Sequence, residues 1–523
     1  MNEHRLLCYL ATAVFVLAVC SLTVPAMAQM TSVGIDCSQV NQLHLLMQEN
    51  LRAGKALIEC GIVKGGGTPS EQEAEDNYPQ PPNILVSNRS CSSQSTCTKS
   101  ENMVWSSPDG QTIVVTYNDD YGVSNNGVSG LSYSTNGGAT FTEVIPPPFN
   151  TGHGFNYGDP IVVYNQKLGK WFGGDLATSC GGFGIGLWTS PDGINWTAGA
   201  CAHNNNNDDR ESMWVDNDPT SAGYGRMYIS FNNFNIGGGA LQLVYSDDGT
   251  TWNGPVTLNS GFVRDVQVTG AQISPTTAKS SLNAYNVVIV ASMDEGGGGA
   301  STRQNIIYRS MNGGASWTST VTGPRFNPVG DSACGYFYQV NPIIRHMGWG
   351  EPAVGPNNVV HYAYAGAGAS NNDHGDIYYV RSADNGATWS TPIKLNTDPD
   401  QQYHTQWMPS VSVNPAGKVT VSWYDRRQAS TACNTYTDVG CSYNRYAIQS
   451  SDNGNTWGTD FAVTTTLSPQ PSQLDPNLVS CYAGDYDYNT ARGSNAFITW
   501  TDGRRSVNST AVQDVNFAVV PEQ

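Results

Sequence analysis

Several short stretches of the sequence combine carboxylates with arginine, tyrosine or histidine. A glycosidase needs such groups: an acid that protonates the leaving oxygen, a second group at the anomeric carbon, and arginines when the sugar carries a carboxylate. The candidate stretches begin at His153, Asp208, Arg264, Met293, Trp349, Tyr403, Tyr424, Gly484 and Asp502. They are far apart in the chain, so a fold must gather them at one place before they can act together.

A turn signature that recurs six times indicates what this fold is. It reads Ser-x-Asp/Asn-(x)-Gly-x-Thr/Ser-Trp/Phe, and its copies begin at Ser134, Ser190, Ser246, Ser310, Ser382 and Ser451. The Ser hydroxyl and the Asp or Asn side chain can bond backbone amides in the turn, Gly supplies a positive φ, and the aromatic anchors the returning strand. The aromatic positions lie 55 to 72 residues apart, a spacing that fits one four-stranded sheet for each repeat. The pattern predicts a β-propeller.

The blade count follows from the strands that lack a signature. Seven pairs of apolar first and second strands can be counted, and the seventh set ends with AspValAsnPheAlaValVal at 514–520 without a signature of its own. This is explained if AsnIleLeuVal at 83–86 supplies the outermost strand of the last blade, which ties the termini together and removes the open edges of the ring. We therefore expect an all-β propeller of seven blades in one domain, residues 83–523. Six blades is the alternative.

The six signatures resemble the Asp-box, or BNR repeat, of the sialidase-like β-propeller superfamily, and the resemblance extends from about Asn83 to the end of the chain. In the families that carry them, Asp-boxes are structural turns found in glycosidases, sorting receptors and assembly factors alike. The resemblance therefore implies architecture more than activity. True sialidases have six blades and carry an Arg-Ile-Pro-type motif ahead of the first box, and nothing between Asn83 and Ser134 matches that motif.

Blade geometry assigns the polar stretches to one face. The turn between third and fourth strands lies on one face, so the loops between second and third strands and between blades emerge on the other. There we expect Glu211, Glu351 and Tyr486 to form the nucleophile and its activator, because a Tyr replaces the carboxylate nucleophile in sialidases. Asp209 or Asp265 is the candidate acid/base. The candidate substrate-binding residues, with the arginines as a carboxylate clamp, are Arg210, Arg426, Arg504 and His404.

An architectural interpretation competes with this one. TrpTyrAspArgArg at 423–427 and TrpThrAspGlyArgArg at 500–505 occupy equivalent places in two blades. Equivalence by repeat usually means structure, in which case Asp425 and Asp502 pair with nearby arginines and backbone.

The first 82 residues stand apart from the propeller repeats. Residues 1–28 have an apolar run from Leu6 to Val24 and end in AlaMetAla, which is typical of a cleaved secretory signal; a lipoprotein signal ending at Cys20 is the alternative. Residues 29–82 contain a predicted helix from Cys37 to about Ile62 and an acidic linker at 65–82. We therefore expect an exported protein, periplasmic or extracellular, and no later stretch is long and apolar enough for a membrane span.

Ten of the 12 cysteines remain once Cys8 and Cys20 are removed with the signal. An even number in an exported protein favours disulfides over metal or redox sites. Closeness in sequence or in the inferred fold suggests the pairs Cys37–Cys60, Cys91–Cys97, Cys180–Cys201, Cys433–Cys441 and Cys334–Cys481.

The composition restricts the partners. The formal net charge is −18 with only 13% charged residues, so the chain lacks the basic stripe that nucleic acid requires. No cofactor is expected; loops at Asn118 and Asn204 offer oxygen ligands for Ca²⁺ but lack the spacing of a recognised metal loop. We expect a secreted, monomeric, sialidase-like glycoside hydrolase that acts on a glycan or glycoconjugate, exo-acting on an acidic sugar. The alternative is a non-catalytic extracellular or cell-surface propeller that binds glycan or protein.

Overall fold

The computed structural model describes residues 29–66, 83–87, 98–120, 127–271, 284–295, 302–330, 332–334, 337–341, 344–346, 348–368, 373–399, 403–428, 442–464, 466–469, 473, 475–507 and 510–522. The predicted signal peptide with its Cys20 alternative, most of the acidic linker, and the bridges Cys91–Cys97 and Cys433–Cys441 lie outside these residues.

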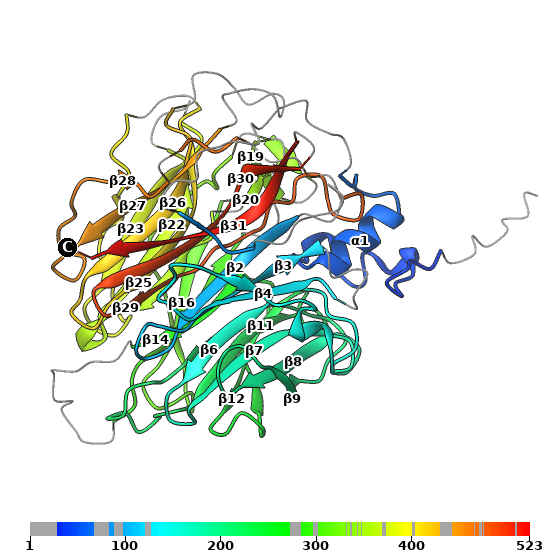
Figure 1. The fold of residues 1–523 in the computed structure, drawn as a ribbon, viewed down its shortest axis with the longest axis horizontal. Helices are drawn as coiled ribbons and strands as arrows, with labels where there is room; N and C mark the ends of the chain where they lie inside the picture. Colours follow the sequence, from blue (N-terminus) through cyan, green and yellow to red (C-terminus); the bar gives the residue numbers. More distant parts are fainter. Residues whose placement is uncertain are drawn as a thin grey trace, which may run out of the picture.

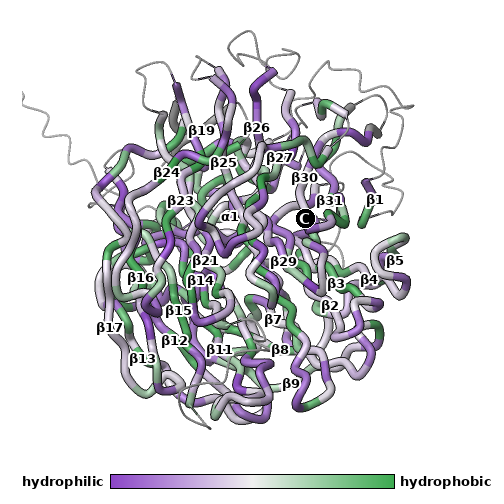
Figure 2. The backbone as a smooth tube through the Cα atoms, turned by 90° about the vertical axis from the view of Figure 1, so that its left-hand side faces the viewer, coloured by the Kyte–Doolittle hydropathy of each residue, from purple (hydrophilic) through white to green (hydrophobic). Residues whose placement is uncertain are grey.

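Seven four-stranded antiparallel sheets follow one another around a ring, as the sequence predicted (Figures 1 and 2). The first two are β2 (Lys99–Ser106), β3 (Ile113–Asp119), β4 (Ser129–Ser134) and β5 (Thr142–Glu143), then β6 (Ile161–Asn165), β7 (Lys170–Ala177), β8 (Gly184–Ser190) and β9 (Thr197–His203). The next two are β10 (Asp208–Val215), β11 (Met227–Asn233), β12 (Ala240–Ser246) and β13 (Asn253–Asn259), then β14 (Arg264–Gly270), β15 (Val288–Asp294), β16 (Gln304–Ser310) and β17 (Thr318–Val321).

The remaining blades complete the ring. They are β21 (Glu351–Val354), β22 (Val360–Gly366), β23 (Asp376–Ser382) and β24 (Ile393–Lys394); β25 (Gln406–Val413), β26 (Val419–Asp425), β27 (Asn444–Ser450) and β28 (Phe461–Ala462); and β29 (Asn489–Arg492), β30 (Asn495–Val507), β31 (Thr510–Pro521) and β1 (Ile84–Leu85). A small sheet of β18 (Ser332–Cys334), β19 (Phe337–Asn341) and β20 (Ile344–His346) is inserted between β17 and β21. Short 3₁₀ turns lie at Pro148–Asn150 and Pro356–Asn358.

The last blade is closed by the start of the propeller. Ile84 pairs with Phe517 and Leu85 with Asn516, so β1 forms the outermost strand of the sheet that ends with β31. The first strands of successive blades contact one another, and β29 contacts β2. The predicted closure is thus confirmed, and it explains why the seventh blade has no turn signature.

The core of the propeller lies between neighbouring blades. The first and second strands of most blades are buried along nearly their whole length. Trp171, Trp407, Trp423 and Trp500 on these strands and Trp188 on a third strand are fully buried. Figure 2 colours many strands green over part of their length, which marks hydrophobic residues. Each sheet therefore buries both of its faces against its neighbours, which is how radial repetition stabilises a long chain without one large core.

The six turn signatures form the turns between third and fourth strands, here called the motif turns. In the fifth, Ser382 Oγ accepts from the Gly386 amide at 2.8 Å, and Asp384 accepts from the Thr388 amide at 2.8 Å and its hydroxyl at 2.7 Å. The aromatic of the motif then reaches the preceding blade, where Trp389 Nε1 donates to Thr320 at 3.1 Å. The turns thus join neighbouring blades as well as strands.

One motif turn begins a residue earlier than its sequence suggests. The sixth copy was expected to begin at Ser451, yet the hydroxyl that accepts from the Gly454 amide, at 2.9 Å, belongs to Ser450. The doubled serine concealed the correct start. Asp452 completes the turn as Asp384 does in the fifth, accepting from the Thr456 amide at 2.8 Å.

The predicted helix from Cys37 to Ile62 is not continuous. It consists of 3₁₀ turns at Cys37–Gln39 and Leu45–Met47 and one α-helix, α1 (Leu51–Glu59). Two conformations break it: His44 is left-handed, with a φ of 54°, and Asn50 is extended and caps α1 by accepting from the Ala53 amide at 2.9 Å. The reason for the break is a contact with the propeller, described below. α1 lies at one side of the ring in Figure 1 and at its centre in Figure 2, so it covers one end of the axis.

Two of the predicted disulfides are present among the described residues. Cys37–Cys60 closes the N-terminal segment, and Cys180–Cys201 joins the loop between β7 and β8 to strand β9 of the second blade. Cys481 is also disulfide-bonded, and its pairing with Cys334 stays a prediction.

A motif-turn aspartate should act through its acceptor oxygens. Hydrogen bonds from the Thr388 hydroxyl, Ser382 and the Thr388 amide lower the pKa of Asp384 to about 2. Asn136 and Asn312 hold the same place in two other motif turns. We therefore expect Asp384→Asn to change the free energy of unfolding by less than about 0.5 kcal/mol at pH 7, and Asp384→Ala to lower it by about 1 kcal/mol.

Urea unfolding at pH 7 and pH 3 measures both effects. Because the folded-state pKa is lowered, the charge-dependent stabilisation is present above pH 4 and is lost as the pH falls toward 2. The Asn variant should therefore lose less stability than the native chain on acidification. Equal destabilisation by Asn and Ala at pH 7 would contradict the acceptor role.

Candidate functional site

The ionisable residues of the first strands gather at the end of the central channel opposite the motif turns, here called the mouth. First strands begin there, whereas the motif turns follow the ends of third strands, which run in the same direction. The separation of turns and ionisable groups onto two faces was predicted from blade geometry, and the strand pairings agree with it.

A shared backbone irregularity directs side chains into the mouth. β2, β10, β14 and β25 each carry a register shift near their start. Within each shift lies one residue with a positive φ: Glu101 (55°), Arg210 (53°), Asp265 (58°) and Met408 (52°); Asp159, just before β6, has a φ of 60°. Such bulges change the direction in which a side chain points. A positive φ is unfavourable for residues other than glycine. Their repetition in several blades indicates that side-chain direction matters at the mouth.

Arg210 lies at the centre of the charged cluster. Its Nη2 donates to Asp265 at 2.9 Å, and its guanidinium stacks over the Tyr486 ring at 3.6 Å from the ring centre. The side chain is almost fully buried. Three residues predicted from sequence therefore lie in contact, although they come from three different blades.

Two further arginines reach the same place, and neither was among the residues predicted for the site. Arg264, at the start of β14, pairs with Glu49 Oε1 at 2.5 Å and with Glu295 at 3.0 Å. Arg345, on β20, makes two hydrogen bonds to Asp485 at 2.9 and 2.6 Å. The Arg264-Asp265 pair was a visible polar stretch, but no sequence signal connected the inserted sheet with the mouth.

Glu49 of the N-terminal segment is the residue that these arginines surround. Besides its contact with Arg264, its Oε2 lies 3.5 Å from Arg210 Nε, and its backbone carbonyl accepts from Arg345 at 2.9 Å. Glu49 is 4% exposed. Burial raises its pKa to about 8, although the charges of Arg264 and Arg210 lower it.

A pair of carboxyl groups lies beside the arginines. Glu101 and Asp159 share a hydrogen bond, and Glu101 also accepts from Asn118 at 2.5 Å and from the Asp485 amide at 3.0 Å. Burial, with the charges of Asp159 and Asp485, raises the pKa of Glu101 well above its ordinary value. Two acids in contact do not both ionise, so this pair holds a proton at neutral pH. The candidate stretch that begins at His153 ends with Asp159, but no role was assigned to that residue, and sequence reasoning did not single out Glu101.

The predicted acids Asp209 and Glu211 have different environments. Asp209 accepts from the Glu49 amide at 2.7 Å and from the Asn50 side chain at 2.9 Å, and burial followed by the charge of Asp159 raises its pKa to about 7. Glu211 is fully buried, and neither carboxyl oxygen has a hydrogen-bond partner among the described residues. Burial, and then the charges of Asp159 and Asp175, raise its pKa well above the ordinary value.

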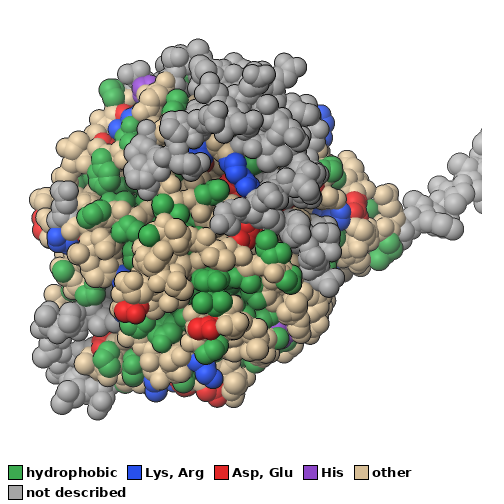
Figure 3. Space-filling view, viewed as in Figure 1, with side chains coloured by type: hydrophobic (Ala, Val, Ile, Leu, Met, Phe, Trp, Pro, Cys, Tyr) green, Lys and Arg blue, Asp and Glu red, His purple; other side chains and the backbone are tan. Residues whose placement is uncertain are grey.

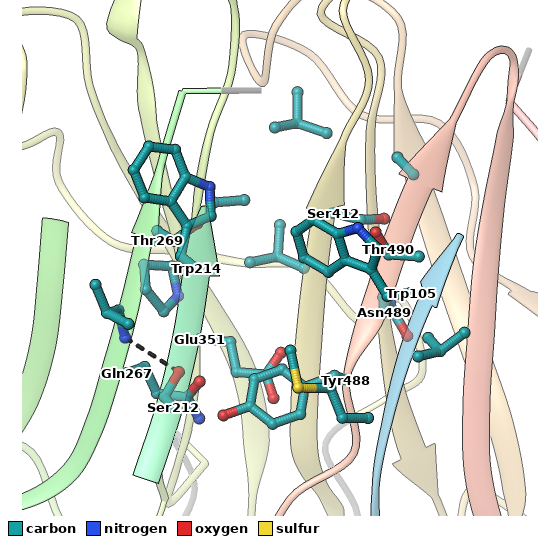
Figure 4. A pocket seen from close by; sticks show the side chains of 18 of the residues that line it. Trp105, Ser212, Trp214, Gln267, Thr269, Glu351, Ser412, Tyr488, Asn489 and Thr490 are labelled. Carbon is teal, nitrogen blue, oxygen red and sulfur yellow. Dashed lines mark hydrogen bonds between the residues drawn. The ribbon is translucent and has the colours of Figure 1, made fainter. Parts of the chain in front are cut away.

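Glu351 belongs to the channel below the mouth. It faces a small cavity of about 60 Å³ together with Tyr488, Trp105 and Trp214, and Figure 4 shows Glu351 and Tyr488 side by side at one end of this cavity. Glu351 also accepts a hydrogen bond from Ser410. The cavity is smaller than the several hundred Å³ typical of ligand pockets and has room for a few water molecules. Tyr488, and not Tyr486, thus lines the same cavity as Glu351, and sequence reasoning did not single it out.

The other predicted binding residues lie outside this cluster. Arg504 donates to Asp502 at 2.8 Å and to Asn83 at 3.0 Å on the closing blade. His404 lies 3.6 Å from Asp398. Arg426 follows β26, and its amide donates to the Thr405 carbonyl at 3.0 Å. Arg504 therefore fits the architectural interpretation. The arginines that face one carboxylate, that of Glu49, are Arg210 and Arg264 instead, and Arg345 binds the Glu49 backbone.

A metal site is not formed by the one His/Cys/Asp/Glu group found in the described part of the chain. His153, Cys180 and Cys201 bring their ligand atoms within 4.8 Å of one another. The two cysteines are joined in a disulfide, however, so neither offers a thiolate.

Two features concern the surface. On the face shown in Figure 3, lysines and arginines are scattered singly or in small groups among neutral residues. Among the described residues, no helix is long and apolar enough to cross a membrane.

Comparisons with known proteins give only distant structural matches. No family model matches the chain, and no curated protein does. Among solved structures, a polysaccharide lyase of family PL25, an ulvan lyase, is 11% identical with a TM-score of 0.45, covering 88% of this chain and 95% of its own. An α-L-arabinofuranosidase from Fusarium graminearum is 13% identical (TM-score 0.39; 84% and 97% covered), and the Aleuria aurantia lectin is 11% identical (TM-score 0.35; 69% and 96% covered). At these values the likeness carries no information on activity.

The buried acids predict how stability depends on pH. Burial raises the pKa of Glu49 to about 8 and those of Asp209, Asp487 and Glu522 to about 7. A group whose pKa is raised on folding contributes stability that is complete below its unfolded pKa, near 4, and is lost as the pH rises through the folded value. We therefore expect the melting temperature to fall between pH 5 and pH 9, as scanning calorimetry can measure.

Substitution of one acid tests the cause. Glu522→Gln removes an acid far from the mouth, next to Asn414 and Thr420, and should flatten part of the decline without touching the mouth. A melting temperature that rises from pH 5 to pH 8 would contradict the assignment of neutral buried acids.

Proposed function

We propose that this protein is an exported glycoside hydrolase that acts on glycans bearing an acidic sugar, with its site at the mouth. The observation that carries the proposal is the setting of Glu49: Arg264 and Arg210 face its carboxylate, and Arg345 binds its backbone. Buried arginines arranged around a carboxylate are suited to a sugar carboxylate as well, because the guanidinium matches its charge and shape.

The proposed roles use buried groups at the mouth whose charges act on one another. Tyr486 would be the nucleophile: its hydroxyl is buried and has no hydrogen-bond partner among the described residues. Asp159 would accept its proton, because the charges of Asp159 and Glu101 are those that act most strongly on the Tyr486 hydroxyl after burial. Asp209, with a pKa raised to about 7, is suited to protonate the leaving oxygen near neutral pH.

Export is supported by the disulfides. Cys37–Cys60 and Cys180–Cys201 are of the kind that form and persist in oxidising compartments. We infer on this basis that residues 1–28 are a secretory signal and that 29–82 and 83–523 are the mature N-terminal segment and propeller.

A specific observation favours the second candidate, a non-catalytic propeller that binds acidic glycans. Burial and the charges of Asp159 and Glu101 raise the pKa of Tyr486 well above its ordinary value, which disfavours the ionised form that a nucleophile must approach. The same arginines would then hold the ligand without turnover. The two candidates differ in the fate of the bound sugar and not in where it binds.

Activity on charged and neutral glycosides separates the candidates. We expect fluorogenic sialosides or glucuronides to be cleaved and the matching glucoside not to be, and Tyr486→Phe to lower kcat at least about 100-fold. The control is Tyr379→Phe, which should leave turnover unchanged. It removes a buried hydroxyl that is hydrogen-bonded to His361, and both residues lie in the blade formed by β21 to β24.

The assay should include Glu49→Ala beside the native chain, because Glu49 itself occupies the arginines. Calorimetric binding without turnover in both proteins would support the non-catalytic candidate. Equal turnover of charged and neutral glycosides would contradict the role given to the arginines.

A further inference from the structure

The N-terminal segment, residues 29–62, docks on the propeller through a short extended stretch. Gln48, Glu49 and Asn50 lie between the turn at Leu45–Met47 and α1, and the backbone at Gln48 and Asn50 is extended. An amide or carboxylate on each of three successive residues then faces the propeller. Gln48 donates to Asn207 at 2.9 Å, and Asn50 donates to Asp209 at 2.9 Å.

The contacts of this stretch are those of a ligand in a binding site. Glu49 offers its carboxylate to Arg264 and Arg210, its carbonyl to Arg345 and its amide to Asp209. The amide, the carbonyl and one carboxylate oxygen of Glu49 are thus bound by the mouth, and these partners come from three different parts of the fold. A helix packed for stability alone would need apolar contacts and not this set.

The segment has a core of its own, separate from the blade cores. Its buried apolar residues cluster with one another, and Cys37–Cys60 closes the segment on itself. The cluster consists of Ile35, Val40, Leu45, Ala53, Ala56 and Leu57. Apolar contact with the propeller involves chiefly Leu51, which packs with Val128, Leu478 and Tyr482. The segment can therefore separate from the mouth while most of its own apolar contacts remain.

We propose that the N-terminal segment is an intramolecular inhibitor whose Glu49 occupies the place of the ligand's carboxylate. This inference rests on the proposed function, because it takes the same arginines as the carboxylate subsite. A ligand and Glu49 cannot both be held by Arg264 and Arg210, so binding of an acidic sugar requires Glu49 to leave. The apparent affinity of the native chain is then reduced by the fraction of molecules in which the segment is docked.

Titration calorimetry on four full-length proteins tests the competition. The probes are N-acetylneuraminate and D-glucuronate, with D-glucose as the uncharged control. We expect Glu49→Ala to bind at least one acidic sugar at least tenfold more tightly than the native chain, and Glu49→Gln to fall between the two. The matched control is Glu59→Gln in the same segment, where Glu59 pairs with Lys55 at 3.2 Å on the surface; its affinity should equal that of the native chain.

Hydrogen exchange of the native chain tests displacement directly, without any substitution. We expect amides in α1 and at 48–50 to exchange faster when the mouth is saturated with the acidic sugar. The test does not depend on whether Glu49→Ala folds. Hydrogen exchange uses the native chain, and Glu49→Gln keeps a hydrogen-bonding group for the arginines.

The outcomes separate the inhibitor from the function. Equal affinity of the native and Glu49 proteins, with unchanged exchange, overturns the inhibitor and leaves the proposed function standing. Failure of all four folded proteins to bind either acidic sugar overturns the carboxylate subsite, and the inhibitor with it. Tighter binding of glucose by Glu49→Ala would mean that the residue blocks space and not a charge-specific site, and would also overturn the proposal.

Discussion

Burial of charge at the ring axis is the constraint on which the mouth depends. Seven first strands meet there, and their ionisable side chains have almost no access to water. A buried charge without compensation costs several kcal/mol, so each acid must pair with an arginine or keep its proton. Asp265 and Asp485 pair with arginines. Glu49 also faces two arginines, although burial still raises its pKa to about 8. Burial raises the pKa values of Glu101 and Glu211 well above their ordinary value.

The two faces of the propeller use the same residue type in opposite ways. A motif-turn aspartate such as Asp384 is near the surface and accepts several hydrogen bonds, which lower its pKa. An aspartate at the mouth such as Asp159 is fully buried, and burial raises its pKa. Residue type alone does not distinguish these carboxylates. The turn signature does, because it marks the aspartates whose hydrogen bonds are made within one turn. Architecture and chemistry are thus assigned to opposite ends of the channel.

Local signals explain why the fold could be predicted and the site only in part. Each motif turn is specified by a stretch of about eight residues. The missing seventh copy indicated that residues 83–86 complete the last blade. Arg210, Asp265 and Tyr486 were found because polar residues at the start of first strands must converge. Arg345 and Glu49 were missed because each comes from outside the repeats, from the inserted sheet and from the N-terminal segment. Their positions depend on tertiary contacts that no periodicity records.

The broken helix shows a place where tertiary contacts override a helical pattern in the local sequence. Apolar residues at helical spacing run through Cys37–Ile62, so periodicity alone favours one helix. Asn50 before Leu51 is nevertheless a good N-cap. In the structure its side-chain oxygen caps α1 by accepting from the Ala53 amide, and its side-chain nitrogen donates to Asp209. A continuous helix would leave the Ala53 amide bonded internally but would withdraw Glu49 from Arg264 and Arg210, stranding buried charge at the mouth. The cost of that uncompensated charge exceeds the few hydrogen bonds that a longer helix would add, and the chain therefore bends at Glu49.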